Sequence, residues 1–69
     1  MITVLKEIRV KKGLSQAELS HVVKVHSTAI SQIERRKTAA WTRLRREIAK
    51  ALEMDETVLF EENGLAREG

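Results

Sequence analysis

The sequence has no cysteine, no proline and only three glycines in its 69 residues. Without cysteine, the chain forms neither disulfide bonds nor thiolate metal sites, which suits a reducing compartment and leads us to expect a cytoplasmic protein. The absence of proline and the scarcity of glycine leave little of the turn chemistry that a β-sandwich or β-barrel needs. No apolar run approaches the roughly 20 residues of a membrane span, so we expect no membrane partner.

Size and hydrophobic content indicate one small helical domain. With 69 residues, of which 42% are hydrophobic, the chain can build a single core, but a marginal one. Apolar residues recur at helical spacing along most of the sequence. We therefore predict an all-α fold, a compact bundle of about five short helices. The start of the chain, MITVLKEIRVKK, lacks the continuous apolar stretch of a signal peptide and is better interpreted as a helix.

Charge is unevenly distributed along the chain. Residues 1–52 carry twelve Lys or Arg and four Asp or Glu, a net charge of +8, whereas residues 53–69 carry one Arg and six acidic residues, a net charge of −5. A basic body with an acidic C-terminal segment favours a polyanionic partner for the body. A solvated, charge-rich surface would show the same pattern, so charge alone does not decide between the two interpretations.

Local capping signals predict where the first two helices begin. Thr3 is placed as the N-cap of a helix over residues 3–12, and Gly13 follows as a left-handed stop. Ser15, with Glu18 three residues later, forms a capping box. This box opens a second helix over residues 16–23.

A very tight turn at Lys24 and Val25 is predicted to join the second helix to the third. The third helix starts at His26 or Ser27 and extends to about residue 36, with Ile30 and Ile33 on its inner face. Such a unit holds its second helix out from the domain at a fixed angle. A projecting helix of this kind has the width of the DNA major groove.

The outer face of the third helix is polar but mostly uncharged. It carries Ser27, Thr28, Ser31, Gln32 and Arg35. Hydroxyl and amide groups reach into a groove and hydrogen-bond to base edges or phosphates. The alternative is that Ser27 and Thr28 only cap the helix.

The C-terminal third is predicted to contain a fourth helix over residues 41–52 and a short fifth helix capped by Asp55. The buried side of the fourth helix is expected to consist of Trp41, Leu44, Ile48, Ala51 and Leu52. Trp41 and the apolar cluster of Val58, Leu59 and Phe60 either complete the core or form a dimer interface. We place the domain at residues 1–62 and expect residues 63–69 to be a disordered tail.

Four segments, in order and at matching spacing, carry a resemblance to a known family. They are Leu5–Arg9, GLSQ-x-x-L at residues 13–19, Ile30–Arg35 and IAKAL at residues 48–52. The chain resembles the lambda-repressor-like, Xre/Cro family of helix-turn-helix DNA-binding domains over about residues 4–60. The resemblance implies double-stranded DNA as partner and dimers formed through the fourth and fifth helices.

The resemblance also implies roles for individual residues. Family positions at or near base edges correspond to His26, Ser27, Thr28 and Gln32. Positions that contact phosphate correspond to Gln16, Arg35, Arg36 and Lys37, with Arg43 a weaker candidate. The position of Gln16 also implies that its side chain braces a side chain of the third helix. Arg9 and Glu34 match a structural ion pair between helices. The dimer interface candidates are Trp41, Val58, Leu59 and Phe60.

Three positions depart from the family pattern. Glycine is usual at or near Lys24, Arg36 and Glu53, and charged residues stand there instead. Holding a residue other than glycine in the left-handed conformation costs about 1 kcal/mol. The three turns are therefore expected to be strained or differently shaped.

The leading hypothesis is a sequence-specific DNA-binding regulator of transcription, more readily a repressor than an activator, acting as a homodimer. A protein-interaction module, such as the antitoxin half of a toxin pair, is the alternative, with a restriction–modification controller as a narrower one. His21 and His26 lack further ligands for zinc, and no nucleophile–base pair or phosphate cradle is present. We expect no enzyme activity, metal or cofactor. His26 at the groove would add a pH response, but an exposed residue without such a role is the simpler interpretation.

Overall fold

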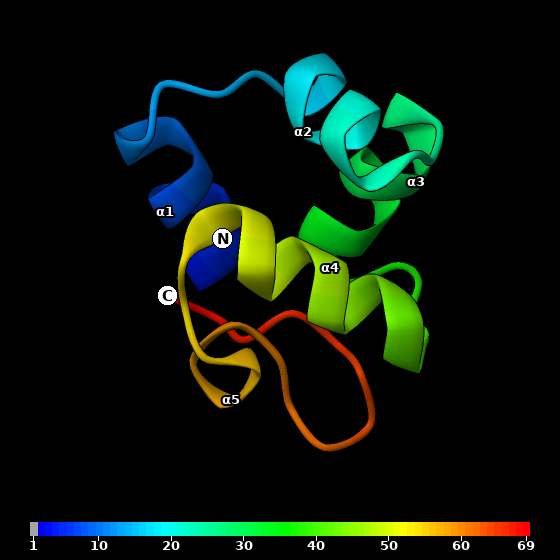
Figure 1. The fold of residues 1–69 in the computed structure, drawn as a ribbon. Helices are drawn as coiled ribbons and strands as arrows, with labels where there is room; N and C mark the ends of the chain where they lie inside the picture. The colour runs from blue at the N-terminus through cyan, green and yellow to red at the C-terminus, as the bar shows by residue number, and fades with distance from the viewer. Residues whose placement is uncertain (1) are drawn as a thin grey trace.

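Five helices make up the fold in a computed structural model, which describes residues 2–69. In chain order they are α1 (Val4–Lys11), α2 (Gln16–Val23), α3 (Ser27–Glu34), α4 (Thr42–Leu52) and α5 (Glu56–Leu59) (Figure 1). Residues 2–69 contain two isolated bridges, Thr3 with Glu68 and Phe60 with Ala66, but no strand. The predicted all-α fold is confirmed.

The core lies around α4, which crosses the middle of the molecule. Figure 1 shows α2 and α3 on one side of α4, and α5 with the C-terminal segment on the other. The most deeply buried large apolar side chains come from all five helices: Leu5, Leu19, Ile30, Ile33, Leu44, Ile48, Leu52 and Leu59. Each such burial stabilises the fold by about 1.5–3 kcal/mol. Because α3 contributes Ile30 and Ile33 to this core, the core fixes the position of α3 relative to the other helices.

The first two helices begin where the capping signals predict, whereas Asp55 precedes α5 as predicted but its side chain makes no capping hydrogen bond. The Thr3 hydroxyl accepts a hydrogen bond from the N–H of Lys6 at 3.3 Å and caps α1. The Ser15 hydroxyl accepts from the N–H of Glu18 at 3.0 Å, and the Glu18 carboxylate accepts from the N–H of Ser15 at 2.8 Å. The predicted capping box is confirmed, and it fixes the first residue of α2.

Four helices end in the same left-handed turn. The left-handed residues are Gly13 (φ 75°), Lys24 (φ 61°), Arg36 (φ 61°) and Glu53 (φ 57°). After each of them the next N–H bonds to a carbonyl five residues back, as Lys37 does to Gln32 at 3.0 Å. The three charged residues thus adopt the left-handed conformation that the family pattern usually assigns to glycine. Each carries a strain of about 1–2 kcal/mol.

The start of α4 differs from the prediction. Trp41 is the N-cap, and its side chain is 52% exposed. Because it precedes the first helical turn, Trp41 does not share the inward face of the helix, and its predicted place in the core is wrong. The buried residues of α4 are Leu44, Ile48, Ala49 and Leu52. Ala51, which the prediction counted among them, is half-buried.

The C-terminal segment is packed, in contrast to the predicted disordered tail. Ala66 is fully buried. The N–H of Arg67 donates to the carbonyl of Leu59 at 2.9 Å, and the carbonyl of Arg67 accepts from the N–H of Val4 at 2.9 Å. The N–H of Gly69 donates to the carbonyl of Ile2 at 2.8 Å, which explains why the two ends of the chain lie together in Figure 1. The packed unit therefore extends beyond the predicted boundary at residue 62.

Candidate nucleic-acid interface

The outer face of α3 consists of exposed polar side chains on a helix anchored by buried ones. Ile30 and Ile33 are fully buried, so α3 cannot rotate about its axis without opening the core. The predicted base-contacting residues all lie in solvent: His26, Ser27, Thr28 and Gln32. The helix therefore presents them as one rigid surface.

The capping alternative for Ser27 and Thr28 is not what the structure shows. The N-cap of α3 is His26, and its side chain makes no capping hydrogen bond. Ser27 is the first residue of the helix itself. No hydrogen bond engages the Ser27 or Thr28 hydroxyl within the described part of the chain, so both groups are free to meet an external partner.

A buried ion pair between α1 and α3 sets the orientation of the outer face. Arg9 Nε donates to Glu34 Oε2 at 2.6 Å, and the two side chains are only 7% and 2% exposed. Arg9 Nη1 also donates to the carbonyl of Leu14 at 2.7 Å. The pair implied by the resemblance is thus present, and a backbone carbonyl and the Gln16 amide make further hydrogen bonds to it.

Gln16 joins α2 to the same ion pair. Its Nε2 donates to Glu34 Oε1 at 2.9 Å, and the side chain is half-buried. The Gln16 amide therefore braces α3 through Glu34, as the resemblance implies, and a contact between Gln16 and phosphate stays a prediction. Three helices meet at the Glu34 carboxylate, so the angle between α2 and α3 does not depend on the turn alone.

The predicted phosphate-contacting cations fall into two groups. Arg35, Lys37 and Arg43 are exposed. Arg36 instead donates to Glu61 Oε2 at 2.8 Å and lies 3.4 Å from Glu68 Oε2. Its side chain is only 23% exposed, so the C-terminal segment holds it.

Sequence reasoning missed the partners of Arg36 and a contact near Gln32. Glu61 and Glu68 are 25 and 32 residues from Arg36, and no local spacing rule connects them. The Thr38 hydroxyl donates to Gln32 Oε1 at 3.3 Å. A hydroxyl residue just after the end of a polar helix face is a signal for such a contact, but a weak one.

Two exposed carboxylates make hydrogen bonds at helix ends: Glu18 at the start of α2 and Glu53 at the end of α4. The backbone N–H of Ser15 donates to the Glu18 carboxylate and lowers the pKa of that carboxyl below its ordinary value, with help from the Ser15 hydroxyl. The hydrogen bond from Lys12, at 2.9 Å, lowers the pKa of Glu53 in the same direction. Both carboxyls are therefore in their stabilising, charged form near neutral pH.

The candidate dimer residues are split between surface and core. Trp41 and Val58 are 52% and 40% exposed. Leu59 and Phe60 are 0% and 3% exposed and belong to the core of the protomer itself. Only the first two are available to a partner, so the expected interface through Leu59 and Phe60 does not fit this fold.

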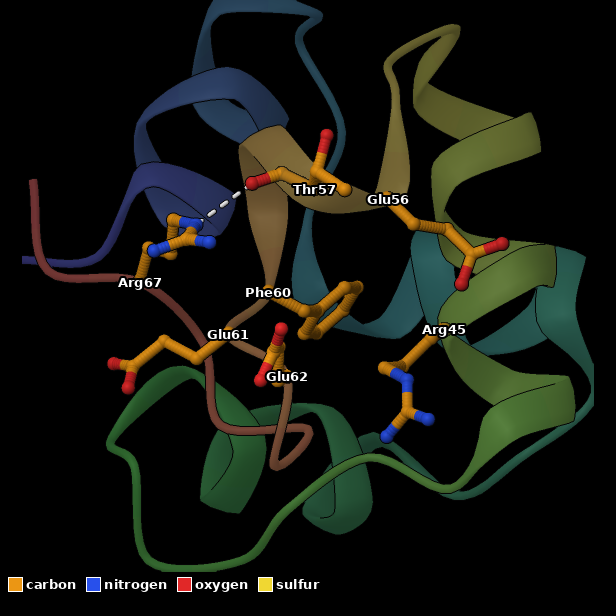
Figure 2. A pocket seen from close by; sticks show the side chains of 7 residues that line it. All are labelled: Arg45, Glu56, Thr57, Phe60, Glu61, Glu62 and Arg67. Carbon is orange, nitrogen blue, oxygen red and sulfur yellow. Dashed lines mark hydrogen bonds between the residues drawn. The ribbon is translucent and has the colours of Figure 1, made fainter.

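A hollow of about 200 Å³ lies between α4, α5 and the C-terminal segment (Figure 2). Its lining residues are Arg45, Glu56, Thr57, Phe60, Glu61, Glu62 and Arg67. None of them is a predicted DNA contact. Arg67 Nε donates to the carbonyl of Thr57 at 2.7 Å, and Arg45 Nη1 donates to the carbonyl of Ala40 at 2.6 Å, so internal bonds already engage both cations.

Comparison with known families agrees with this geometry. A family model described as helix-turn-helix matches residues 5–59, most of the chain. The chain belongs to the helix-turn-helix family. The match is to its lambda-repressor-like, Xre/Cro type, which confirms the resemblance seen in the sequence. No individually curated protein matches the chain.

Membership in the helix-turn-helix family supports a DNA-binding transcription regulator in general. Families of this kind are typically not enzymes. Within residues 2–69, no three acidic or histidine side chains are grouped to hold a metal ion. In the same residues, no helix is long and apolar enough to cross a membrane.

Proposed function

We propose that this helix-turn-helix protein is a sequence-specific repressor of transcription that reads the DNA major groove with α3. The observation that carries the proposal is the outer face of α3, where exposed hydroxyl and amide groups stand on a helix braced by the Arg9–Glu34 pair. Major-groove readout needs donors and acceptors held in fixed positions. Repression is the simpler form of regulation because occupying an operator requires binding alone.

The proposal divides the contacts between bases and phosphates. Base edges are met by His26, Ser27, Thr28 and Gln32, at and after the N-terminus of α3. Phosphates are met by the exposed cations Arg35, Lys37 and Arg43. The backbone at Gln16, the first residue of α2, adds a helix N-terminus that favours an anion. Arg36 has a smaller part than its position in the family suggests, since Glu61 and Glu68 engage it.

A homodimer follows from the same reasoning. Trp41 and Val58 leave apolar surface exposed on a domain with a small core. A two-fold dimer would place two copies of α3 about 34 Å apart, one turn of DNA, and would bind a palindromic operator.

The protein-interaction alternative is weakened by the structure. One support for this alternative is the acidic C-terminal segment, which would engage a basic partner if it were free. Glu61 and Glu68 instead pair with Arg36, and Glu53 pairs with Lys12. Half of the six acidic residues after residue 52 thus already have a partner within the chain. A restriction–modification controller would share the DNA mechanism proposed here.

Selection of bound duplexes from a random DNA pool at physiological salt tests the proposal. We expect a palindromic consensus with half-sites about ten base pairs apart. Gln32→Ala should cost about 1–3 kcal/mol on the selected site and relax the preference at one position. Lys37→Ala is the matched control: it should weaken selected and random DNA alike and reduce the salt slope by about one. Equal losses on both kinds of DNA for both variants would contradict the division of contacts.

A further inference from the structure

Thr38 lies beside the one amide on the outer face of α3. Its hydroxyl donates to Gln32 Oε1 at 3.3 Å, and both side chains are exposed. The left-handed turn at the end of α3 creates this proximity, because the N–H of Lys37 returns to the carbonyl of Gln32 at 3.0 Å. Thr38 is the next residue after Lys37, and its hydroxyl therefore lies within hydrogen-bonding distance of the Gln32 side chain.

The segment that carries Thr38 is anchored on both sides. Before it, Arg36 pairs with Glu61 at 2.8 Å and with Glu68 at 3.4 Å. After it, the N–H of Ala40 donates to the carbonyl of Gly64 at 2.9 Å, and Ala40 is buried. The hydroxyl of Thr38 thus belongs to a tethered loop rather than to a free end.

The direction of this hydrogen bond decides what Gln32 offers to DNA. A free glutamine amide can turn over and read adenine with both its oxygen and its nitrogen, as acceptor and donor. With Oε1 accepting from Thr38, the NH₂ group of Gln32 has no hydrogen-bond partner among the described residues and is left to bond to a base edge. Two N–H donors match a base edge with two acceptors, and guanine presents N7 and O6 in the major groove.

We propose that Thr38 is a positioning residue that fixes the Gln32 amide with its NH₂ group left for the base edge, so that Gln32 selects guanine over adenine. The inference rests on the proposed function, since it assigns the base preference of the same face. It adds a residue outside the helix-turn-helix unit to the determinants of specificity. Thr38 itself touches no base; it acts through Gln32.

The experiment compares four proteins in the same selection from random DNA: wild type, Gln32→Ala, Thr38→Val and Thr38→Ser. Gln32→Ala identifies the base position that Gln32 reads. At that position, wild type and Thr38→Ser, which keeps the donor, should prefer guanine to adenine by about tenfold. Thr38→Val keeps the shape but has no donor, so its preference for guanine should fall to about threefold or less, or change to adenine. Affinity for random DNA and its salt slope should not change in either Thr38 variant.

A second measurement separates positioning from folding. Thr38 is exposed, so Thr38→Val should leave the unfolding midpoint close to that of wild type. In the free protein, the side-chain amide signals of Gln32 in a nitrogen–proton correlation spectrum should shift in Thr38→Val, toward the positions of a glutamine amide that makes no hydrogen bond within the protein. Unchanged Gln32 signals in Thr38→Val would overturn the inference without any DNA present.

The outcomes distinguish this inference from the proposed function. A consensus in which Thr38→Val keeps the full guanine preference, or in which wild type prefers adenine, overturns the role of Thr38 and leaves the function standing. A wild-type protein that selects no consensus overturns both. Guanine preference that depends on the donor at position 38 supports both.

Discussion

The turn between α2 and α3 holds Lys24 at φ 61° and ψ 46°, in the left-handed region. Its side chain is exposed, and no ion pair of the described residues includes it. This conformation costs a residue with a Cβ atom about 1–2 kcal/mol, which glycine avoids. Glycine also loosens the unfolded chain, which offsets about 0.4–1 kcal/mol of that gain. Lys24→Gly should therefore raise the free energy of unfolding by about 0.5–1 kcal/mol.

Urea unfolding followed by far-ultraviolet circular dichroism measures this difference. Lys24→Ala is the matched control, because alanine removes the charge but keeps the Cβ atom and hence the strain. We expect Lys24→Ala to stay within about 0.5 kcal/mol of wild type. In a thermal scan, Lys24→Gly should raise the midpoint by about 2–8 °C for a domain of this size. The slope of the unfolding free energy against urea concentration should not change, since neither variant alters the surface exposed on unfolding.

Glu53→Gly provides an internal comparison. It relieves the same strain at φ 57° but removes the exposed ion pair with Lys12. Its gain should therefore be smaller than that of Lys24→Gly. If Lys24→Gly were no more stable than Lys24→Ala, the argument from left-handed strain would be refuted. An equal gain for glycine and alanine would point to repulsion of the lysine charge instead.

Three further predictions concern the groups that hold the helices. Glu34→Gln leaves the buried Arg9 without its charged partner and should cost about 3–5 kcal/mol in urea unfolding, whereas replacing both residues by apolar ones should recover much of the loss. Because the pKa of Glu18 is lowered in the folded state, its stabilisation is complete above about pH 4.3 and is lost as the pH falls through the lower folded value. Glu18→Gln should thus flatten the acid limb of stability against pH, and an unchanged limb would contradict the capping argument. Arg36→Met should speed amide exchange at Arg67 while affecting DNA affinity less than Lys37→Met; the reverse order would mean that Arg36 leaves its carboxylates to bind phosphate.

The parts of the fold that sequence predicts are those set by local chemistry. The capping box at Ser15 and Glu18 depends on residues three apart, so its presence can be inferred before any tertiary contact is known. The end of α1 at Gly13 follows in the same way. The Arg9–Glu34 pair spans 25 residues and was accessible only through the family resemblance.

The parts that sequence missed depend on tertiary placement. The packing of residues 63–69 relies on hydrogen bonds to Val4 and Leu59, which lie far away in the chain. The ion pair between Arg36 and Glu61 depends on that packing, so it could not be predicted before the packing was known. The prediction that Trp41 is buried assumed that α4 starts at residue 41, but the helix starts at residue 42. Successive helical residues point about 100° apart around the axis, so an error of one residue in the start changes which side chains face the core.

Trp41 is the only tryptophan of the chain, and its half-exposed position makes it a fluorescent reporter of the surface rather than of the core. Unfolding should change its emission little, because the indole is already in contact with water. Association of two protomers over this face would exclude that water and shift the emission to shorter wavelength. A titration of protein concentration without DNA would therefore observe dimer formation separately from operator binding, with no label added.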